Sequence, residues 1–118
     1  MTAQFTELTE RLIAFRDARH WRRFHGLKTL MISLNLEASE LLELTQWKSD
    51  GQVEAAIDDA DFRRRLGEEC ADVLIYLLLI CERAGIDLDQ ATRDKITLNG
   101  TKYPVEKVRG NARKYTEL

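Results

Sequence analysis

The chain has 118 residues, and its 18 Lys and Arg against 20 Asp and Glu give a formal net charge of −2 at pH 7. This length suits a single domain over positions 1–118, and the near-neutral charge argues against nucleic acid or an anionic membrane as the main partner. An apolar fraction of 44 % with one Pro and six Gly excludes a disordered chain and favours long helices, hence an all-α fold.

Helical periodicity and chain-breaking residues divide the sequence into four long helices. They are expected at residues 6–20, 27–48, 61–84 and 88–102, with a weaker segment at 53–60 that is a short helix or an ordered loop. Gly26 precedes the second helix, Gly85 ends the third, and Asp87 can cap the fourth, which must end before Pro104. The pattern predicts a four-helix bundle-like domain with a C-terminal tail at 103–118.

The expected location is the cytoplasm. The first residues have neither the basic nor the apolar region of an export signal, and no apolar run approaches the roughly 20 residues of a spanning helix. Cys70 and Cys81 would lie about 16 Å apart along one helix, too far for a mutual disulfide. We therefore expect a soluble protein with two buried thiols in a reducing compartment.

Carboxylates occupy the apolar face of the second predicted helix. At about 100° per residue, Leu30, Leu34, Leu41 and Leu44 all fall within about 60° of Glu37. Glu40 projects beside Glu37 at i+3. Glu37 has no basic residue one turn away on either side, so no ion pair within its own helix can neutralise it.

The third predicted helix repeats this arrangement. Phe62, Val73, Tyr76 and Ile80 lie within about 40° of Glu69, and Asp72 follows at i+3. The alternative is a solvated, ion-paired acidic face, which we expect for Glu43 and Glu68. Four carboxylates that face one interior repel each other, and protonation relieves only one or two, whereas a divalent cation relieves all four.

The donor set indicates which cation to expect. Oxygen ligands from Glu37, Glu40, Glu69 and Asp72 suit Mg²⁺, with Mn²⁺ as a substitute or Ca²⁺ as a further hard ion. Zinc sites prefer His and Cys, and a di-iron bundle needs Glu-x-x-His motifs that the chain lacks. Because Mg²⁺ completes its shell with water and substrate phosphates, the site points toward phosphate chemistry.

Two tetrapeptides, Glu37-Ala38-Ser39-Glu40 and Glu69-Cys70-Ala71-Asp72, resemble the Glu-x-x-Glu and Glu-x-x-Asp signature of the MazG-like all-α nucleoside triphosphate pyrophosphohydrolases. The surrounding segments at 21–25, 40–48, 68–77, 95–104 and 113–118 resemble the branch that contains the dCTP pyrophosphatases, so the likeness covers nearly the whole chain.

This resemblance implies hydrolysis of a (deoxy)nucleoside triphosphate to the monophosphate and pyrophosphate with Mg²⁺, in a dimer of dimers whose pockets are completed by neighbouring subunits. The two acidic motifs match the metal ligands and catalytic residues. The resemblance also implies substrate-binding roles for Trp21, Trp47 and Tyr76 around the base, and for Lys95, Asn99 and Tyr103 near phosphate and sugar; His25 is a further candidate.

Structural roles remain open for these substrate-binding candidates. The aromatic residues can pack in a core or an interface, His25 can cap or pack, Lys95 and Asn99 can form an exposed face, and Tyr103 can anchor the tail. Eukaryotic members of the branch carry a histidine where this chain has Leu12, which leaves the preferred base open.

Three functions are therefore weighed. The first is a house-cleaning hydrolase for dCTP or a modified pyrimidine dNTP. The second is a dUTP-type or broad-specificity pyrophosphohydrolase, and the third is a non-catalytic nucleotide- or metal-binding regulator. Retention of all four carboxylates favours an enzyme over the regulator.

Overall fold

The computed structural model describes residues 1–118 and contains helices without strands. Along the chain these are α1 (Ala3–Ala18), a 3-10 turn (Arg22–Phe24), α2 (Leu27–Glu43), α3 (Asp50–Ala56), α4 (Ala60–Ala84), α5 (Leu88–Lys102), α6 (Val105–Val108) and a second 3-10 turn (Tyr115–Glu117). The predicted all-α class is confirmed. None of the helices combines the length and the apolar character needed to cross a membrane.

Short polar side chains begin four of the helices. Each of these side chains accepts a hydrogen bond from the backbone N–H three residues later, and the residues are Thr2, Ser49, Asp59 and Asp87. Such a cap contributes about 1 kcal/mol to helix stability. Gly85 ends α4 with φ = 68°, in the left-handed region that favours glycine.

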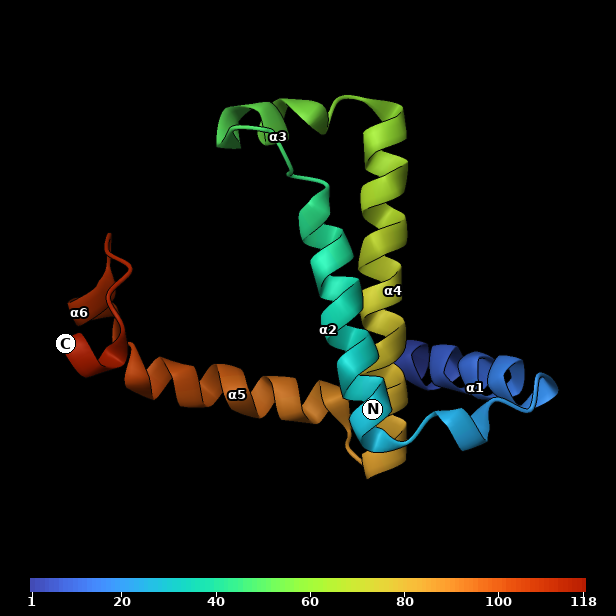
Figure 1. The fold of residues 1–118 in the computed structure, drawn as a ribbon. Helices are drawn as coiled ribbons and strands as arrows, with labels where there is room; N and C mark the ends of the chain where they lie inside the picture. Colours follow the sequence, from blue (N-terminus) through green and yellow to red (C-terminus); the bar gives the residue numbers. More distant parts are fainter.

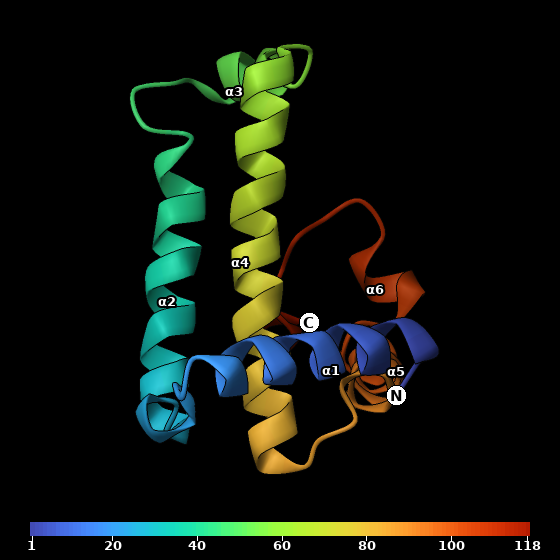
Figure 2. The same cartoon turned by 90° about the vertical axis from the view of Figure 1, so that its right-hand side faces the viewer.

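The antiparallel pair α2 and α4 holds the core. The two helices lie side by side, with α3 across the top of the pair and α1 crossing α4 near its lower end (Figure 1 and Figure 2). The most deeply buried apolar side chains are Leu30, Leu44, Phe62, Leu78, Leu79 and Cys81. Their burial holds α2 against α4 and fixes the faces that carry the acidic motifs.

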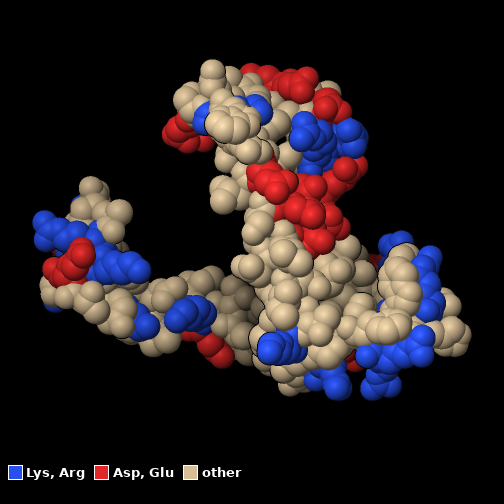
Figure 3. Space-filling model, in the orientation of Figure 1, with Lys and Arg blue, Asp and Glu red and all other residues tan.

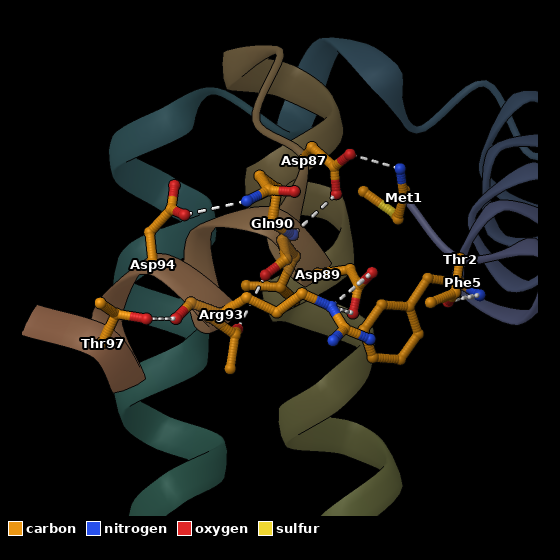
Figure 4. Close-up of polar contacts among 11 residues, drawn as sticks. Met1, Thr2, Phe5, Asp87, Asp89, Gln90, Arg93, Asp94 and Thr97 are labelled. Atoms are coloured by element: carbon orange, nitrogen blue, oxygen red, sulfur yellow. Dashed lines mark hydrogen bonds and ion pairs between the residues drawn. The ribbon is translucent and has the colours of Figure 1, made fainter. Parts of the chain in front are cut away.

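Helix α5 leaves the lower end of α4 and extends away from the pair (Figure 1). It buries none of its residues. At its start the Met1 amino group forms an ion pair with the Asp87 carboxylate, and Gln90 donates to Asp94 over 2.9 Å (Figure 4). The radius of gyration is 17.8 Å, against about 13–14 Å for a compact chain of this length, because α5 and the tail project outward.

Several predicted features need correction, beginning with the first helix, which spans Ala3–Ala18 rather than residues 6–20. Cys70 is exposed rather than buried, because it sits beside the apolar stripe of α4, whereas Cys81 is buried as expected. The second helix ends at Glu43 rather than Lys48, because the chain turns sharply and brings Trp47 to φ = 66°. The weak segment is helical from Asp50 to Ala56, whereas the predicted limits of α5 are confirmed.

Candidate metal and nucleotide site

Helices α2 and α4 bring the two acidic motifs together. One carboxylate oxygen from each of Glu37, Glu40 and Glu69 lies within 4.8 Å of the others. A continuous acidic patch covers this part of the helix pair (Figure 3). The convergence follows from the register of the pair, since Glu37 and Glu69 both lie on the stripes that pack the helices together.

Glu37 and Glu69 each have a buried carboxylate oxygen, Oε2, without a hydrogen-bond partner. Buried polar atoms in proteins almost always have a partner, and a buried charge without one is costly. No Lys or Arg forms an ion pair with either residue. The two oxygens are therefore positioned for a ligand that carries positive charge.

The electrostatics of the cluster disfavour its fully charged form. The pKa of Glu37 is raised to about 7. Burial is the largest cause, followed by a side-chain hydrogen bond with Glu40 and the charges of Glu40, Asp72 and Glu69. Burial also raises the pKa of Glu69, and the nearby negative charges of Glu40 and Asp72 raise it further. A cation in the cluster would reverse both shifts.

The remaining acidic residues border the cluster. Asp72 is outside the group of oxygens within 4.8 Å, but its charge raises the pKa of both Glu37 and Glu69. Glu68 pairs with Arg64 over 2.9 Å, which confirms its expected role on a solvated face. Glu43 is exposed, yet its charge acts on Glu69, an effect that its angular position on α2 did not indicate.

This donor set fits a hard divalent cation. Two buried oxygens without partners, a third oxygen close by and a neighbouring aspartate offer only oxygen ligands. The exposed Glu40 leaves the cluster open on one side, where substrate or water can approach. The cluster can therefore hold a metal ion of the Mg²⁺ type.

An apolar pocket of about 630 Å³ lies between α1 and α4. Trp21, His25 and Tyr76 line it, so the structure brings together three of the predicted substrate-binding residues. Leu12 also lines it. Tyr76 follows Asp72 by one turn of α4, so these two side chains lie on the same face of that helix.

Sequence reasoning connected Leu12 with the base pocket but did not identify the other α1 residues that line it, which are Leu8, Arg11, Phe15 and Arg16. Leu8 and Phe15 share a face of α1 with Leu12, and the Phe15 ring meets the ring of Trp21 edge-on at 5.9 Å. Arg16, which also lines the pocket, is buried and pairs with Asp17 over 2.9 Å and with Glu82 over 3.5 Å. The i, i+4, i+7 spacing of the apolar residues was the available signal.

Four predicted residues lie away from the cluster within this chain. The Trp47 side chain is 93 % exposed, beyond the end of α2, and does not line the apolar pocket. Lys95 and Asn99 are exposed on the projecting α5. Tyr103 follows that helix, and its ring meets Tyr115 of the tail edge-on at 6.1 Å, as its alternative anchoring role predicts.

Known proteins share this sequence and arrangement. A sequence model of the MazG-like family matches residues 32–118. Mouse and human dCTP pyrophosphatase 1 are 42 % and 40 % identical to the chain over 104 residues, which cover 88 % of this chain and 61 % of each relative. The chain thus spans about three-fifths of the length of these curated relatives.

A solved structure shows the same fold. The crystal structure of a pyrophosphatase from Archaeoglobus fulgidus superposes with a TM-score of 0.80 at 37 % sequence identity, over 88 % of this chain and 95 % of that one. The acidic motifs, the helix arrangement and these similarities agree. The chain belongs to the MazG-like family.

Proposed function

We propose that this chain hydrolyses a nucleoside triphosphate to the monophosphate and pyrophosphate, with Mg²⁺ as the natural cation and Mn²⁺ as a substitute. The observation that carries the proposal is the pair of buried, unpartnered oxygens of Glu37 and Glu69 beside Glu40. The relatives named dCTP pyrophosphatase and the archaeal structure titled a pyrophosphatase support this reaction class.

In the proposed site, Glu37, Glu40, Glu69 and Asp72 hold the cation. Mg²⁺ bound there would neutralise polyphosphate charge and would make a coordinated water a better nucleophile. Water would attack a phosphorus of the α–β linkage, the bond from that phosphorus to the bridging oxygen would break, and the monophosphate and pyrophosphate would be released. Glu40 is exposed at the mouth of the cluster, where its carboxylate can orient the water and accept its proton.

The apolar pocket between α1 and α4 is the proposed site for the base. Trp21 and Tyr76 offer aromatic surfaces for stacking, and Tyr76 lies one turn of α4 beyond Asp72. Stacking accepts many bases, so selectivity must come from polar contacts at the base edge. The names of the relatives favour dCTP as the substrate, and a modified pyrimidine dNTP is the other substrate that we propose.

A neighbouring subunit is proposed to complete the site. Helix α5 buries none of its residues, and Trp47 is almost fully exposed with φ = 66°. An exposed Trp in a conformation unusual for its residue type suggests a contact outside its own chain. In a dimer of dimers, Trp47, Lys95, Asn99 and Tyr103 of one copy would reach the base, phosphate and sugar bound by another.

Pyrophosphate release from a panel of nucleoside triphosphates tests the reaction. We expect turnover with Mg²⁺, none with EDTA, and loss of at least about 100-fold in kcat for Glu37→Gln, Glu69→Gln and Asp72→Asn. Glu10→Gln is the matched control, because Glu10 is exposed and forms no ion pair. Preferential hydrolysis of dUTP, or similar rates with all bases, would support a dUTP-type or broad-specificity pyrophosphohydrolase. Nucleotide binding without turnover would support a non-catalytic regulator.

A further inference from the structure

A second cavity lies at the opposite end of α2 from the acidic motifs. Its volume is about 470 Å³, and it is lined by Arg22, Arg23, His25, Gly26 and Arg83. No apolar side chain lines it, and three of its five residues carry a permanent positive charge. Basic side chains gather around the connection between α1 and α2, below the acidic patch (Figure 3).

The three arginines of this cavity have no acidic partner. The arginine ion pairs of the structure involve Arg11, Arg16, Arg64 and Arg93. Glu82, the residue before Arg83, pairs with Arg16 instead. Arg23 stacks over Phe24, with its guanidinium 4.7 Å from the ring centre, and this contact leaves its charge unneutralised. Three arginines that line one cavity without a counter-charge favour an anionic ligand.

Backbone groups add to the positive character of this cavity. Gly26 caps α2, a helix of 17 residues, and offers no side chain to accept from the first N–H groups. The first turn of α2 also has no acidic residue. His25 Nδ1 is buried and has no hydrogen-bond partner. The arginines, His25 and Gly26 therefore line one cavity at the start of α2, where no side chain satisfies the first helix N–H groups.

We propose that Arg22, Arg23, Arg83 and His25, with the N-terminus of α2, bind a phosphate-bearing anion at a site separate from the acidic cluster. Guanidinium groups match phosphate oxygens in charge and geometry. The ligand class is inorganic phosphate, pyrophosphate or the phosphates of a nucleotide. Gly26 precedes Glu37 by eleven residues, or about 16 Å along α2. Unlike the acidic cluster, this cavity needs no metal to attract phosphate.

Titration of the full chain in EDTA tests the proposal. Chelation removes the metal that the acidic cluster requires, so phosphate binding then reports on the arginine cavity. We expect saturable binding of pyrophosphate, with chemical shift changes at the backbone amides of residues 26–28 and at the His25 ring. Arg83→Gln and Arg22→Gln should each weaken binding by about tenfold or more.

The matched control is Arg63→Gln, since Arg63 is exposed on α4 and forms no ion pair. It should bind pyrophosphate like the wild type. Absence of saturable binding, or equal weakening in the control, would overturn the proposal. Tighter binding of a non-hydrolysable nucleoside triphosphate identifies a nucleotide as the ligand, and equal affinity identifies free pyrophosphate. Both results support the cavity, and neither depends on the proposed hydrolysis.

Discussion

Glu37 of α2 and Glu69 of α4 lie within one cluster in which a carboxylate oxygen of each is buried without a donor. The helix pair therefore presents two acidic oxygens where apolar packing would be more stable. This relationship favours function over stability, and it gives the metal-free protein a distinct dependence on pH.

The first prediction concerns that pH dependence. The folded-state pKa of Glu37 is about 7, against an ordinary value of 4.5, so the folded chain binds more protons between these pH values. The free energy of unfolding should therefore fall as pH rises from about 4.5 to 7 on account of this group. In EDTA, Tm should drop between pH 5.5 and 8 in the wild type and drop less in Glu37→Gln. Parallel curves would contradict the assignment.

The helix pattern was readable from sequence to a large extent. Asp87 and Pro104 bracket α5, and the limits predicted from them, Leu88–Lys102, match the structure. The end of α2 was misplaced because Thr45 to Trp47 carries no glycine or proline to signal the turn. Periodicity gives the face of a helix, so it located Glu37 and Glu69 on facing stripes.

Tertiary direction was not readable in the same way. The spacing of Lys95 and Asn99 gives no indication that α5 points away from the acidic cluster of its own chain, because no apolar stripe ties it to α4. Cys70 was misjudged because excluding a disulfide with Cys81 does not show whether a free thiol is buried. Both outcomes depend on packing partners rather than on local propensity.

The second prediction compares two glycines of the α4 region, Gly85 at the C-terminal cap and Gly67 inside the helix. Gly85→Ala should destabilise the chain by about 1 kcal/mol, because φ is +68° there and alanine rarely adopts this conformation. Gly67→Ala is the matched comparison inside the helix, where an added Cβ meets nothing within 4 Å, and it should stabilise by about 0.5–1 kcal/mol. Urea unfolding of both variants measures the difference. Equal effects of the two substitutions would be inconsistent with the C-cap geometry.

The third prediction concerns base selectivity. Leu12 lines the apolar pocket and has no group to hydrogen-bond a base edge. Leu12→His should change the ratio of kcat/KM between dCTP and dUTP by about tenfold, because an imidazole donates or accepts at the base edge. Leu12→Met keeps the apolar surface and should leave the ratio unchanged. If both variants show the wild-type ratio, the base lies elsewhere.

The fourth prediction concerns sites shared between subunits. Glu69→Gln and Lys95→Ala should each be inactive alone. When the two variants are mixed and allowed to exchange subunits, about a quarter of wild-type activity should return. About half of the dimers are then hybrids, and each hybrid has one intact site, formed by the acidic cluster of the Lys95→Ala subunit and α5 of the Glu69→Gln subunit. A mixture of Glu69→Gln with Glu37→Gln is the control and should stay inactive. Failure of the first mixture to regain activity would place Lys95 in its own subunit's site or outside any site.

The most direct measurement is a titration of the full chain with Mn²⁺ followed by electron paramagnetic resonance. Free Mn²⁺ gives a strong solution signal, which binding diminishes. The wild type should remove Mn²⁺ saturably and release it to excess Mg²⁺, whereas Glu37→Gln and Glu69→Gln should bind at least about tenfold more weakly and Glu10→Gln should bind normally. Equal Mn²⁺ binding by all four proteins would contradict a metal site at the α2–α4 cluster.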